Sequence, residues 1–347
     1  DGYALVAVRA EDQRVRYTVA SNTTVIEQHA FEGQMYIQEV ELPEGVISIE
    51  KEAFESCQAL RRIVLPEGLT RICADAFRCC ISLEGLELPS TLKDLGEHAV
   101  TDTYGWSPSM NGITYMRVHP DNPYFYHDAN AFYQRRENGS LLIKYFGKNE
   151  VWKIPEEVTE LGAMALRRSN LREVIIPETV KSISKDAFAE CGRLECMEFA
   201  ADGVKLYVPE NPVYRKGEIS SLFYRDNAGQ LHYDYETYDS LLADWSQILI
   251  RCRMAAFRLE YPVQLPTARK QAYEALIAEH LKDLVYDICK RDSLMDLAAL
   301  GNAGMITAEH IEEMIDWTTA CHRGKLTGYL LEYQQEHFTE NTFDFSL

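Results

Sequence analysis

Hydrophobic positions recur at a fixed interval along the first two thirds of the chain. Three consecutive blocks of 23 residues, Thr23–Gly45, Val46–Gly68 and Leu69–Thr91, repeat one frame. In each block an Ala-Phe pair precedes an aliphatic-x-aliphatic-Pro run, and the pairs are Ala30-Phe31, Ala53-Phe54 and Ala76-Phe77. A period of this length predicts a solenoid, in which each unit buries its apolar face against its neighbours.

One block shows how the frame is expected to fold. Within Val46–Gly68 the pattern predicts a short first strand, a turn that carries Ala53-Phe54, and a second strand that ends at Pro66. Proline ends the strand because it has no N–H to donate to a ladder. Stacked blocks place Phe31, Phe54 and Phe77 over one another, so a shared core is predicted.

The frame Val46-x-x-Ile49, Ala53-Phe54-x-x-Cys57, Leu60-x-x-Ile63-x-Leu65-Pro66 resembles the BspA-type leucine-rich repeat, which is common in bacterial proteins. The resemblance covers roughly Asp1 to Tyr214. It implies a right-handed solenoid with a strand-lined concave face that usually serves protein recognition. It implies neither an activity nor a particular ligand.

The pattern divides the chain into four parts. Residues 1–22 are expected to form an N-terminal capping hairpin with strands at Leu5–Val8 and Val15–Val19. The solenoid follows at 23–214, then a polar linker at 215–235 and a helical domain at 236–347. The predicted fold class is α+β and multidomain: a strand-rich leucine-rich-repeat solenoid with a β-hairpin insertion, followed by an all-α domain.

An insertion at residues 101–150 is expected inside the fourth block. That block begins at Leu92, and its closing strand signature returns only at Val151–Pro155. Strands are expected at Ile113–Val118, Ala131–Arg135 and Leu141–Phe146, with Asn138-Gly139 favouring a hairpin turn. Hairpin insertions with an Asn-Pro-x-Tyr element are familiar in the BspA-type family, and Asn122-Pro123-Tyr124 matches that element.

Beyond residue 235 the apolar period changes from 2 toward 3.6, which predicts helices. The expected helices are Tyr238–Leu259, Thr267–His280, Leu281–Lys290, Ser293–Ala299, Ala308–His322 and Lys325–His337. Their starts are marked by Asp239, Thr267, Asp292 and Thr307. The last two helices resemble an ankyrin-type pair, although the Thr-Pro-Leu-His turn of that repeat is absent.

The charge narrows the choice of partners. The chain of 347 residues carries a formal net charge of −19, which argues against nucleic acid and anionic membranes and permits a basic protein partner. No run approaches the roughly 18 apolar residues of a membrane span, so membrane insertion is not expected. Residues 1–8 are too short and lack the basic flank of a signal peptide. A cytoplasmic location is therefore expected, and a secreted or surface location is the alternative if a signal peptide was removed.

The cysteines follow the repeat. Cys57, Cys80 and Cys191, three of the nine, stand three positions after the Phe, where a small buried residue belongs. Reduced thiols are expected, because the remaining cysteines show no framework spacing. No metal or cofactor is predicted, since Cys73, Cys79 and Cys80 lack the paired C-x-x-C of a zinc site.

Two surfaces are candidate binding sites. Strand positions between buried aliphatics are expected on the concave face, namely Glu39, Glu41, Arg62, Val64, Glu87, Glu173, Ile175 and Glu198. They form either an acidic track for a basic partner or a solvated face. The insertion is rich in aromatic residues, and Tyr124 and Tyr126 are candidate contacts, with burial in the core as the alternative.

No catalytic set emerges. His119, Asp121, His127 and Asp128 suggest a metal or acid–base cluster, but the prolines and asparagine among them are typical of a loop. The predicted function is a non-enzymatic protein-interaction scaffold. The alternatives are a cell-surface adhesion module for a host protein or glycan, and an enzyme or switch whose effector is the helical domain. The sequence leaves the oligomeric state open.

Overall fold

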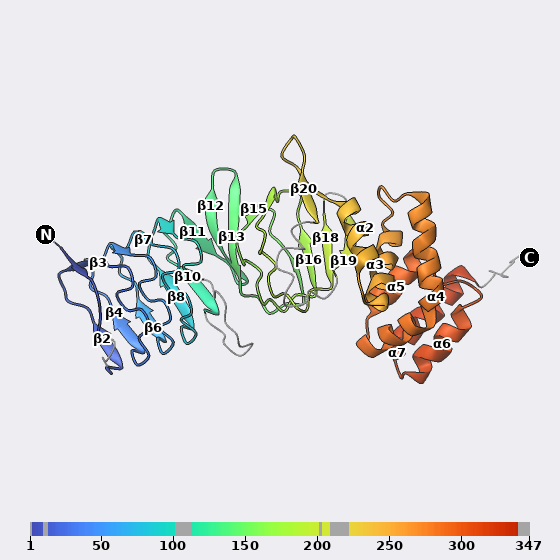
Figure 1. The fold of residues 1–347 in the computed structure, drawn as a ribbon, viewed down its shortest axis with the longest axis horizontal. Helices are drawn as coiled ribbons and strands as arrows, with labels where there is room; N and C mark the ends of the chain where they lie inside the picture. Colours follow the sequence, from blue (N-terminus) through green and yellow to red (C-terminus); the bar gives the residue numbers. More distant parts are fainter. Residues whose placement is uncertain (1, 10–12, 101–112, 201–202, 209–221, 339–347) are drawn as a thin grey trace, which may run out of the picture.

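The computed structural model describes residues 2–9, 13–100, 113–200, 203–208 and 222–338. The molecule is elongated, with a solenoid at its N-terminal end and helices at its C-terminal end (Figure 1). About eight turns run from residue 3 to residue 199. The predicted architecture, a leucine-rich-repeat solenoid followed by a helical region, is confirmed. The predicted segments 101–112, 209–221 and 339–347 lie outside the described residues, and the domain boundaries stay predictions.

Each turn contributes a first strand to one row of strands. In the N-terminal half the first strands pair in parallel, in the order β1 (Tyr3–Leu5), β3 (Thr23–Ile26), β5 (Ser48–Ile49), β7 (Arg71–Ile72) and β9 (Asp94–Leu95). In the C-terminal half they are β13 (Gly139–Tyr145), β15 (Val158–Leu161) and β17 (Ser182–Ile183).

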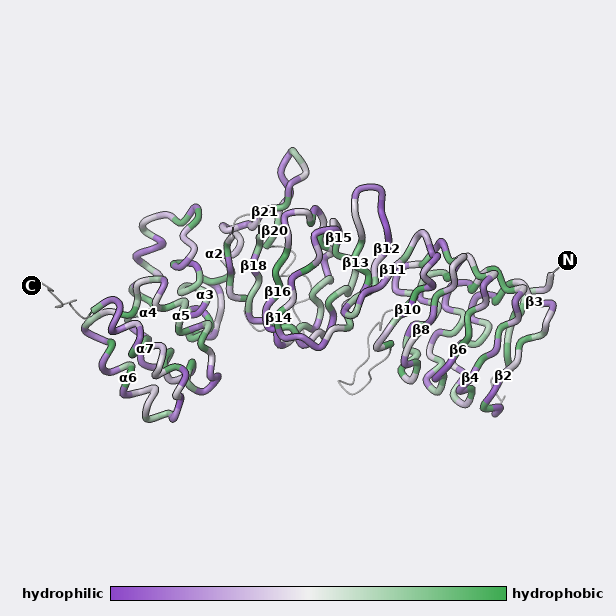
Figure 2. Tube along the Cα trace, turned by 180° about the vertical axis from the view of Figure 1, so that it is seen from behind, coloured by the Kyte–Doolittle hydropathy of each residue, from purple (hydrophilic) through white to green (hydrophobic). Residues whose placement is uncertain are grey.

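A second strand in each turn forms the other row. The N-terminal half holds β2 (Arg16–Thr18), β4 (Glu39–Glu41) and β6 (Arg62–Val64), then β8 (Gly85–Leu88) paired with β10 (Tyr115–Val118). The C-terminal half holds β14 (Val151–Lys153), β16 (Glu173–Ile176) and β18 (Cys196–Phe199), closed by antiparallel β19 (Val204–Tyr207). Hydrophobic and hydrophilic stretches alternate within each turn (Figure 2).

The Phe positions connect successive turns in two ways. The rings of Phe31 and Phe54 stack at 4.6 Å, and those of Phe54 and Phe77 at 5.2 Å, which confirms the predicted stack. The backbone N–H of each Phe also donates to the Ala carbonyl of the next turn: Phe31 to Ala53 (2.7 Å), Phe54 to Ala76 (2.9 Å) and Phe77 to Ala99 (3.0 Å). Ring stacking and backbone bonding therefore enforce the same spacing between turns.

The repeated cysteine completes this arrangement. The Cys57 thiol donates to the Phe31 carbonyl at 2.9 Å, Cys80 to Phe54 at 3.1 Å and Cys191 to Leu166 at 2.9 Å. Burial raises the pKa of the Cys191 thiol to about 11, so the donating proton is present at neutral pH. A buried carbonyl needs a partner, and the thiol three residues after the next Phe supplies one.

The predicted N-terminal hairpin is wrong. β1 pairs in parallel with β3, and β2 pairs in parallel with β4, so the two segments do not pair with each other. Hairpin loops hold about two to five residues, whereas ten residues separate Leu5 from Arg16, enough to cross between the two rows. The Val8 N–H donates to Ala30, as each Phe N–H does to the next turn. These residues therefore form the first turn of the solenoid.

The predicted extent of the insertion is also wrong. β10 pairs in parallel with β8 and closes the interrupted turn, a role that the sequence pattern gave to Val151–Pro155. The pattern misled because Pro120 follows Val118 by two residues rather than one. The antiparallel strands β11 (Phe125–His127), β12 (Ala131–Arg136) and β13 then form hairpins, and β13 serves as the first strand of the next turn.

This hairpin sheet separates two hydrophobic cores. Phe125 and Phe132 belong to the core of the N-terminal half. Tyr133, Leu142 and Tyr145 belong to a second core that continues through the C-terminal half into the helices. Alternation along β12 and β13 sends side chains to both sides, so the sheet acts as a wall between the halves.

The predicted linker contains structure. Its described part, from residue 222, holds an antiparallel hairpin of β20 (Phe223–Arg225) and β21 (Leu231–Tyr233). The Tyr233 ring lies 5.7 Å from the ring of Phe199, and its hydroxyl donates to the Met197 carbonyl at 2.9 Å. The hairpin therefore packs on the last turn, and a purely polar connection is the wrong description.

Six helices follow in the described residues: α2 (Tyr235–Asp244), α3 (Ile248–Glu260), α4 (Thr267–Arg291), α5 (Leu294–Asn302), α6 (Ile311–Ala320) and α7 (Gly324–His337). None of them combines the length and hydrophobicity that crossing a membrane requires. The expected helix 238–259 is two helices, because Trp245 adopts an extended backbone. The expected break at residue 280 is absent, since nothing there interrupts α4.

Three expected helix starts are wrong. Asp234 caps α2 by accepting from the Thr237 N–H, and Asp239 is buried inside the helix. Ser293 caps α5, whereas Asp292 ends α4 in a left-handed conformation. Asp292 was misread because aspartate favours both kinds of helix end. α6 begins after His310, three residues beyond Thr307.

Left-handed residues recur at two places around the Phe position. Two residues before it they are His29, Glu52, Asp75, His98 and Met164, and two residues after it they are Gly33, Ser56, Cys79, Arg168 and Glu190. Residues other than glycine disfavour the left-handed conformation, so the stacked turns must hold the backbone in it.

Replacing Gly33 with alanine is expected to lower the free energy of unfolding by about 1 kcal/mol. Gly33 has φ +69°, and a Cβ there would meet nothing within 4 Å, so the loss comes from the backbone alone. Gly192 is the matched control, because a Cβ there also meets open space and its backbone is not left-handed. Urea denaturation of Gly33→Ala and Gly192→Ala measures the difference. Equal stabilities of the two variants would contradict the account.

Candidate binding face

The second strands present an ordered outward surface. Because strand residues alternate between faces, Val40, Ile63 and Val174 are buried while their neighbours point outward. We name the outward set the second-strand face, and it comprises Arg16, Thr18, Glu39, Glu41, Arg62, Val64, Gly85, Glu87, Tyr115, Arg117, Val151, Lys153, Glu173, Ile175, Glu198 and Lys205.

All eight strand residues proposed from the sequence lie on this face, in two groups. Glu39, Glu41, Arg62, Val64 and Glu87 lie on β4, β6 and β8. Glu173, Ile175 and Glu198 lie in the separate sheet β14–β16–β18–β19. The structure therefore does not bring the eight residues into one sheet, and their role in binding stays a prediction.

Sequence reasoning named one basic member of the face, Arg62, and missed the other four. Arg16 precedes Glu39 by one period of 23 residues and was hidden by the hairpin interpretation. Tyr115 and Arg117 were assigned to the insertion. Lys205 comes from the antiparallel strand β19, which the repeat does not contain, so no periodic signal marks it.

The face as a whole carries no net charge, so the glutamates of the predicted acidic track lie among basic side chains, and their role in binding stays a prediction. Its five glutamates, at 39, 41, 87, 173 and 198, are matched by Arg16, Arg62, Arg117, Lys153 and Lys205. Three of these bases pair with glutamates on other strands. Arg16 Nη2 lies 2.5 Å from Glu39 Oε2 and Arg117 Nη1 lies 3.3 Å from Glu87 Oε1 on the neighbouring strand, whereas Lys205 Nζ reaches across β18 to Glu173 Oε1 at 2.6 Å.

The pair at the C-terminal end is the most enclosed. Partial burial alone would lower the pKa of Lys205, but the hydrogen bond to Glu173 and the nearby charge of Glu198, 3.5 Å away, raise it. Lys205 therefore stays protonated and fixes both carboxylates. Exposed pairs such as Arg117–Glu87 remain available to a ligand, since such pairs stabilise a fold only weakly.

Apolar side chains stand among the charges. Val64, Tyr115 and Val151 are 48%, 42% and 53% exposed, and Ile175 is half-buried. Exposed apolar groups beside charged groups are common at protein-binding surfaces.

The two tyrosines predicted as contacts lie outside this face. Tyr124 is 40% exposed and immediately precedes β11. Tyr126 is half-buried, stacks on Tyr133 at 4.7 Å and donates to the Ser140 hydroxyl at 2.8 Å. Tyr126 therefore packs within the hairpin sheet, and the structure does not join either residue to the second strands.

The Asn-Pro element fastens the hairpin to the preceding turn. Buried Asn122 donates through Nδ2 to the carbonyls of Pro89 (2.7 Å) and Leu92 (3.0 Å). Its Oδ1 accepts from the N–H groups of Tyr124 and Phe125. All the hydrogen bonds of this amide therefore serve the fold.

The His–Asp group of the same loop has structural partners as well. Asp128 accepts from two backbone N–H groups and from the Tyr133 hydroxyl at 2.8 Å. His127 Nδ1 accepts from the Val118 N–H at 3.2 Å, and His119 Nδ1 accepts from the Asp121 N–H at 3.3 Å. These contacts favour loop chemistry over a metal or acid–base site.

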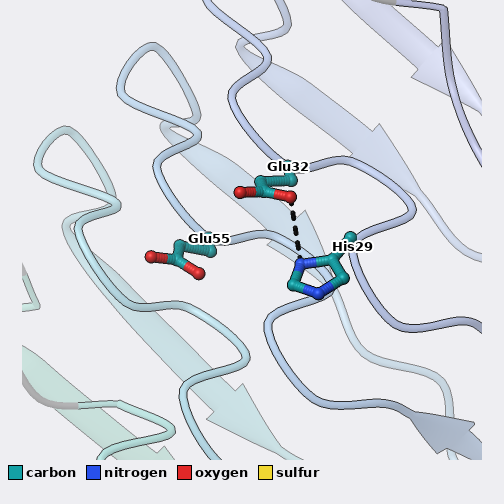
Figure 3. Close-up of side chains that lie close together, drawn as sticks. All are labelled: His29, Glu32 and Glu55. Carbon is teal, nitrogen blue, oxygen red and sulfur yellow. Dashed lines mark ion pairs between the residues drawn. The ribbon is translucent and has the colours of Figure 1, made fainter.

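One group of possible metal ligands occurs among the described residues: His29, Glu32 and Glu55 (Figure 3). His29 Nδ1 lies 3.0 Å from Glu32 Oε2, and Nε2 lies 3.3 Å from Glu52 Oε2. Arg78 pairs with Glu55. An ion-pair ladder along the left-handed turns accounts for the whole group, so we assign no metal to it.

Six copies of a BspA-type leucine-rich repeat region match residues 15–107 and 144–209. These repeats belong to the BspA-type leucine-rich repeat family. The unmatched stretch between the two ranges contains β10, β11 and β12 and the start of β13, so the family pattern lapses at the hairpin sheet. BspA-type proteins are typically surface or adhesion proteins, and they form a scaffold family that is not generally enzymatic.

Solved structures with similarity include bacterial repeat proteins. The pneumococcal vaccine antigen PcpA is 18% identical, with a TM-score of 0.41, over 57% of this chain and 64% of that chain. A leucine-rich cell surface protein from Faecalibacterium prausnitzii is 19% identical, with a TM-score of 0.28, over 55% and 70%. A leucine-rich repeat protein from Eubacterium ventriosum is 17% identical, with a TM-score of 0.40, over 53% and 59%. The matches therefore span less than two thirds of PcpA and of the Eubacterium protein. No curated protein matches the chain.

Two buried arginines connect the helices that follow the last BspA-type turn. Arg253 of α3 pairs with Asp287, and its Nε lies 3.2 Å from Asp296 Oδ2. Its guanidinium also lies over the Tyr207 ring of β19 at 5.8 Å. Arg258 pairs through Nε with Asp239 at 3.1 Å, and its Nη1 and Nη2 donate to the carbonyls of Tyr261 and Val263. A buried charge requires such partners, so this network fixes the helices to one another, and Arg253 also contacts β19.

Asp296 is the carboxylate whose charge is least favoured at this junction. Burial raises its pKa, and the nearby charge of Arg253 opposes the shift only in part. Its Oδ1 has no hydrogen-bond partner within the described part of the chain. A shifted pKa can mark a catalytic acid, but this carboxyl lies in a packed interior and therefore has a structural role.

Replacing Asp296 with asparagine is expected to change how stability depends on pH. Folding raises the pKa above its ordinary value of 3.8, so the folded state keeps a proton that the unfolded chain releases. The contribution of Asp296 is therefore full below pH 3.8 and falls as pH rises through the folded pKa. Urea denaturation between about pH 4 and 7 should show wild-type stability falling relative to Asp296→Asn.

The exposed Asp283 supplies the control, since Asp283→Asn should leave the wild-type pH profile in place. A wild-type protein that gains stability relative to Asp296→Asn over the same range would show that the ion pair with Arg253 outweighs burial.

Proposed function

We propose that the protein is a non-enzymatic recognition scaffold that binds a protein partner on its second-strand face. The observation that carries this proposal is the face itself: successive turns hold ten charged side chains and several exposed apolar ones at fixed spacing. Asn122 and the His–Asp group carry side chains of the kind found in metal and acid–base sites, but here these side chains make hydrogen bonds that serve the fold.

The stacking of turns supports binding energetically. Binding to this face costs little conformational entropy, because the Phe bonds already hold the strands that carry the side chains in place. The face includes Tyr115 and Arg117, and tyrosine and arginine are enriched at the hot spots of protein interfaces.

The balanced charges define the partner better than the net charge does. A face with five acidic and five basic side chains suits a protein surface that carries both signs. A partner that carries both charges therefore takes the place of the basic partner that the glutamates alone had suggested. Nucleic acid fits poorly, because it requires a basic surface and the whole chain carries −19.

A cell-surface adhesion module for a host protein or glycan is the second candidate. The typical role of BspA-type proteins at cell surfaces favours it. Nine free cysteines, three of which donate to a carbonyl of the preceding turn, favour a reducing compartment instead. We therefore propose a cytoplasmic location first and a surface location as the alternative.

Site-specific photo-crosslinking tests the proposed face. Benzoylphenylalanine in place of Val64 is expected to capture a protein in cells of the native host, because Val64 lies at the centre of the N-terminal group. Ile47 is the matched control, since it is similarly exposed (50% against 48%) but immediately precedes β5 in the row of first strands. Once the partner is identified, Val64→Arg should weaken its binding at least about tenfold, and Ile47→Arg should not.

Equal capture from the two positions, or binding that survives Val64→Arg, would exclude this face. Detection of a chemical reaction without a bound partner would overturn the scaffold assignment.

A further inference from the structure

Tyr115 and Gly85 form a unit that no other turn of the solenoid repeats. They are register partners on β10 and β8. The equivalent position is Arg16, Glu39 and Arg62 in the preceding turns, and only here is it glycine. A Cβ on Gly85 would lie 2.3 Å from Tyr115 Cζ and 2.5 Å from both Cε atoms, so the ring occupies the space that a side chain would need.

These three distances fix the orientation of the ring. A point in the ring plane 2.3 Å beyond Cζ would lie about 0.9 Å farther from the two Cε atoms than from Cζ. The nearly equal values therefore place Gly85 against the face of the ring. Tyr115 is nevertheless 42% exposed, so part of its side chain is open to solvent.

Charged groups border the ring. The Arg117 guanidinium lies 5.4 Å from the ring centroid and 3.3 Å from Glu87 Oε1. Both side chains are mostly exposed, at 68% and 72%. Arginine only donates hydrogen bonds and an ionised glutamate only accepts them. The border therefore offers both kinds of bond with no net charge.

We propose that Tyr115 is the stacking platform of a binding site for a neutral pyranose sugar. The apolar C–H face of the sugar ring lies on the exposed part of the Tyr115 ring, and its hydroxyls bond to Glu87 and Arg117. This site goes beyond the proposed protein partner, which is assigned to the second-strand face as a whole.

The local chemistry favours a sugar over a peptide side chain. On β8 and β10 the outward positions are Gly85, Glu87, Tyr115 and Arg117, so one flat ring is the whole apolar surface of this strand pair. A peptide anchor requires a desolvated apolar pocket. A sugar combines one apolar face with a rim of hydroxyls, and it matches a ring bordered by a donor and an acceptor.

A purely structural role for Tyr115 is the competing explanation, because an aromatic ring can shield a glycine in a neighbouring strand. That role requires the inner face of the ring only. The two explanations separate experimentally, since shielding predicts a loss of stability without any ligand.

Saturation-transfer NMR with neutral gluco-, galacto- and manno-oligosaccharides tests the site. Transfer to the protons of at least one sugar is expected with the wild-type protein. Tyr115→Leu should lower the affinity about tenfold, and Tyr115→Phe should retain it because stacking needs no hydroxyl. Gly85→Ala should also weaken binding, since it displaces the ring while Tyr115 is retained. Tyr36→Leu, at a tyrosine that is 51% exposed elsewhere in the same half, is the control.

Thermal unfolding of each variant accompanies the titration, and Tyr115→Phe with Gly85→Ala keeps the test decisive if Tyr115→Leu fails to fold. Absence of binding by every sugar of the set overturns the proposal. So does sugar binding that persists unchanged in Gly85→Ala and Tyr115→Leu. Loss of a protein partner in Tyr115→Leu, with no sugar bound by the wild type, would assign the ring to protein recognition instead. Crosslinking at Val64 reads out the partner separately, so either proposal can fail alone.

Discussion

The bond from each Phe N–H to the Ala carbonyl of the next turn is the constraint on which this structure depends. It connects the same pairs of turns as the stacked phenyl rings, and the thiol of the repeated cysteine donates to the Phe carbonyl. Backbone and side chains thus require the same distance between turns. The left-handed residues on either side of the Phe follow from it, because they let the backbone meet the next turn without an intervening side chain. The spacing of the second-strand face is set by the same bond.

The molecule changes its construction after Val100. Val100 occupies the Phe position of the fifth turn, and the hairpin sheet then closes the first core with Phe125 and Phe132. The second core begins on the other side of that sheet and runs without interruption into the helices. The helical region is therefore a continuation of the solenoid that covers its last turn, and the buried ion pairs of Arg253 and Arg258 hold its helices together.

The periodic part of the fold could be predicted from the sequence, and the exceptions could not. The stack is predicted because the period of 23 residues repeats Phe31, Phe54 and Phe77 in register. The outward position of Glu39 or Val64 follows from alternation alone. The charge of the face could not be predicted, since three of its five bases come from a first turn without the repeat signature, from β10 behind a displaced proline, and from the antiparallel β19. Asp239 illustrates the limit in the helices: an aspartate near a helix start resembles a cap, and only the packed structure shows its ion pairs with Arg258 and Arg269.

Amide hydrogen exchange under native conditions tests the central constraint most directly. The N–H groups of Phe31, Phe54 and Phe77 should be among the slowest to exchange, because opening them requires separation of two turns. The N–H of Gln58, which bonds within its own turn to Ser56, should exchange much faster. If the Phe amides exchange as fast as that of Gln58, the turns are not held by this bond and the account is wrong.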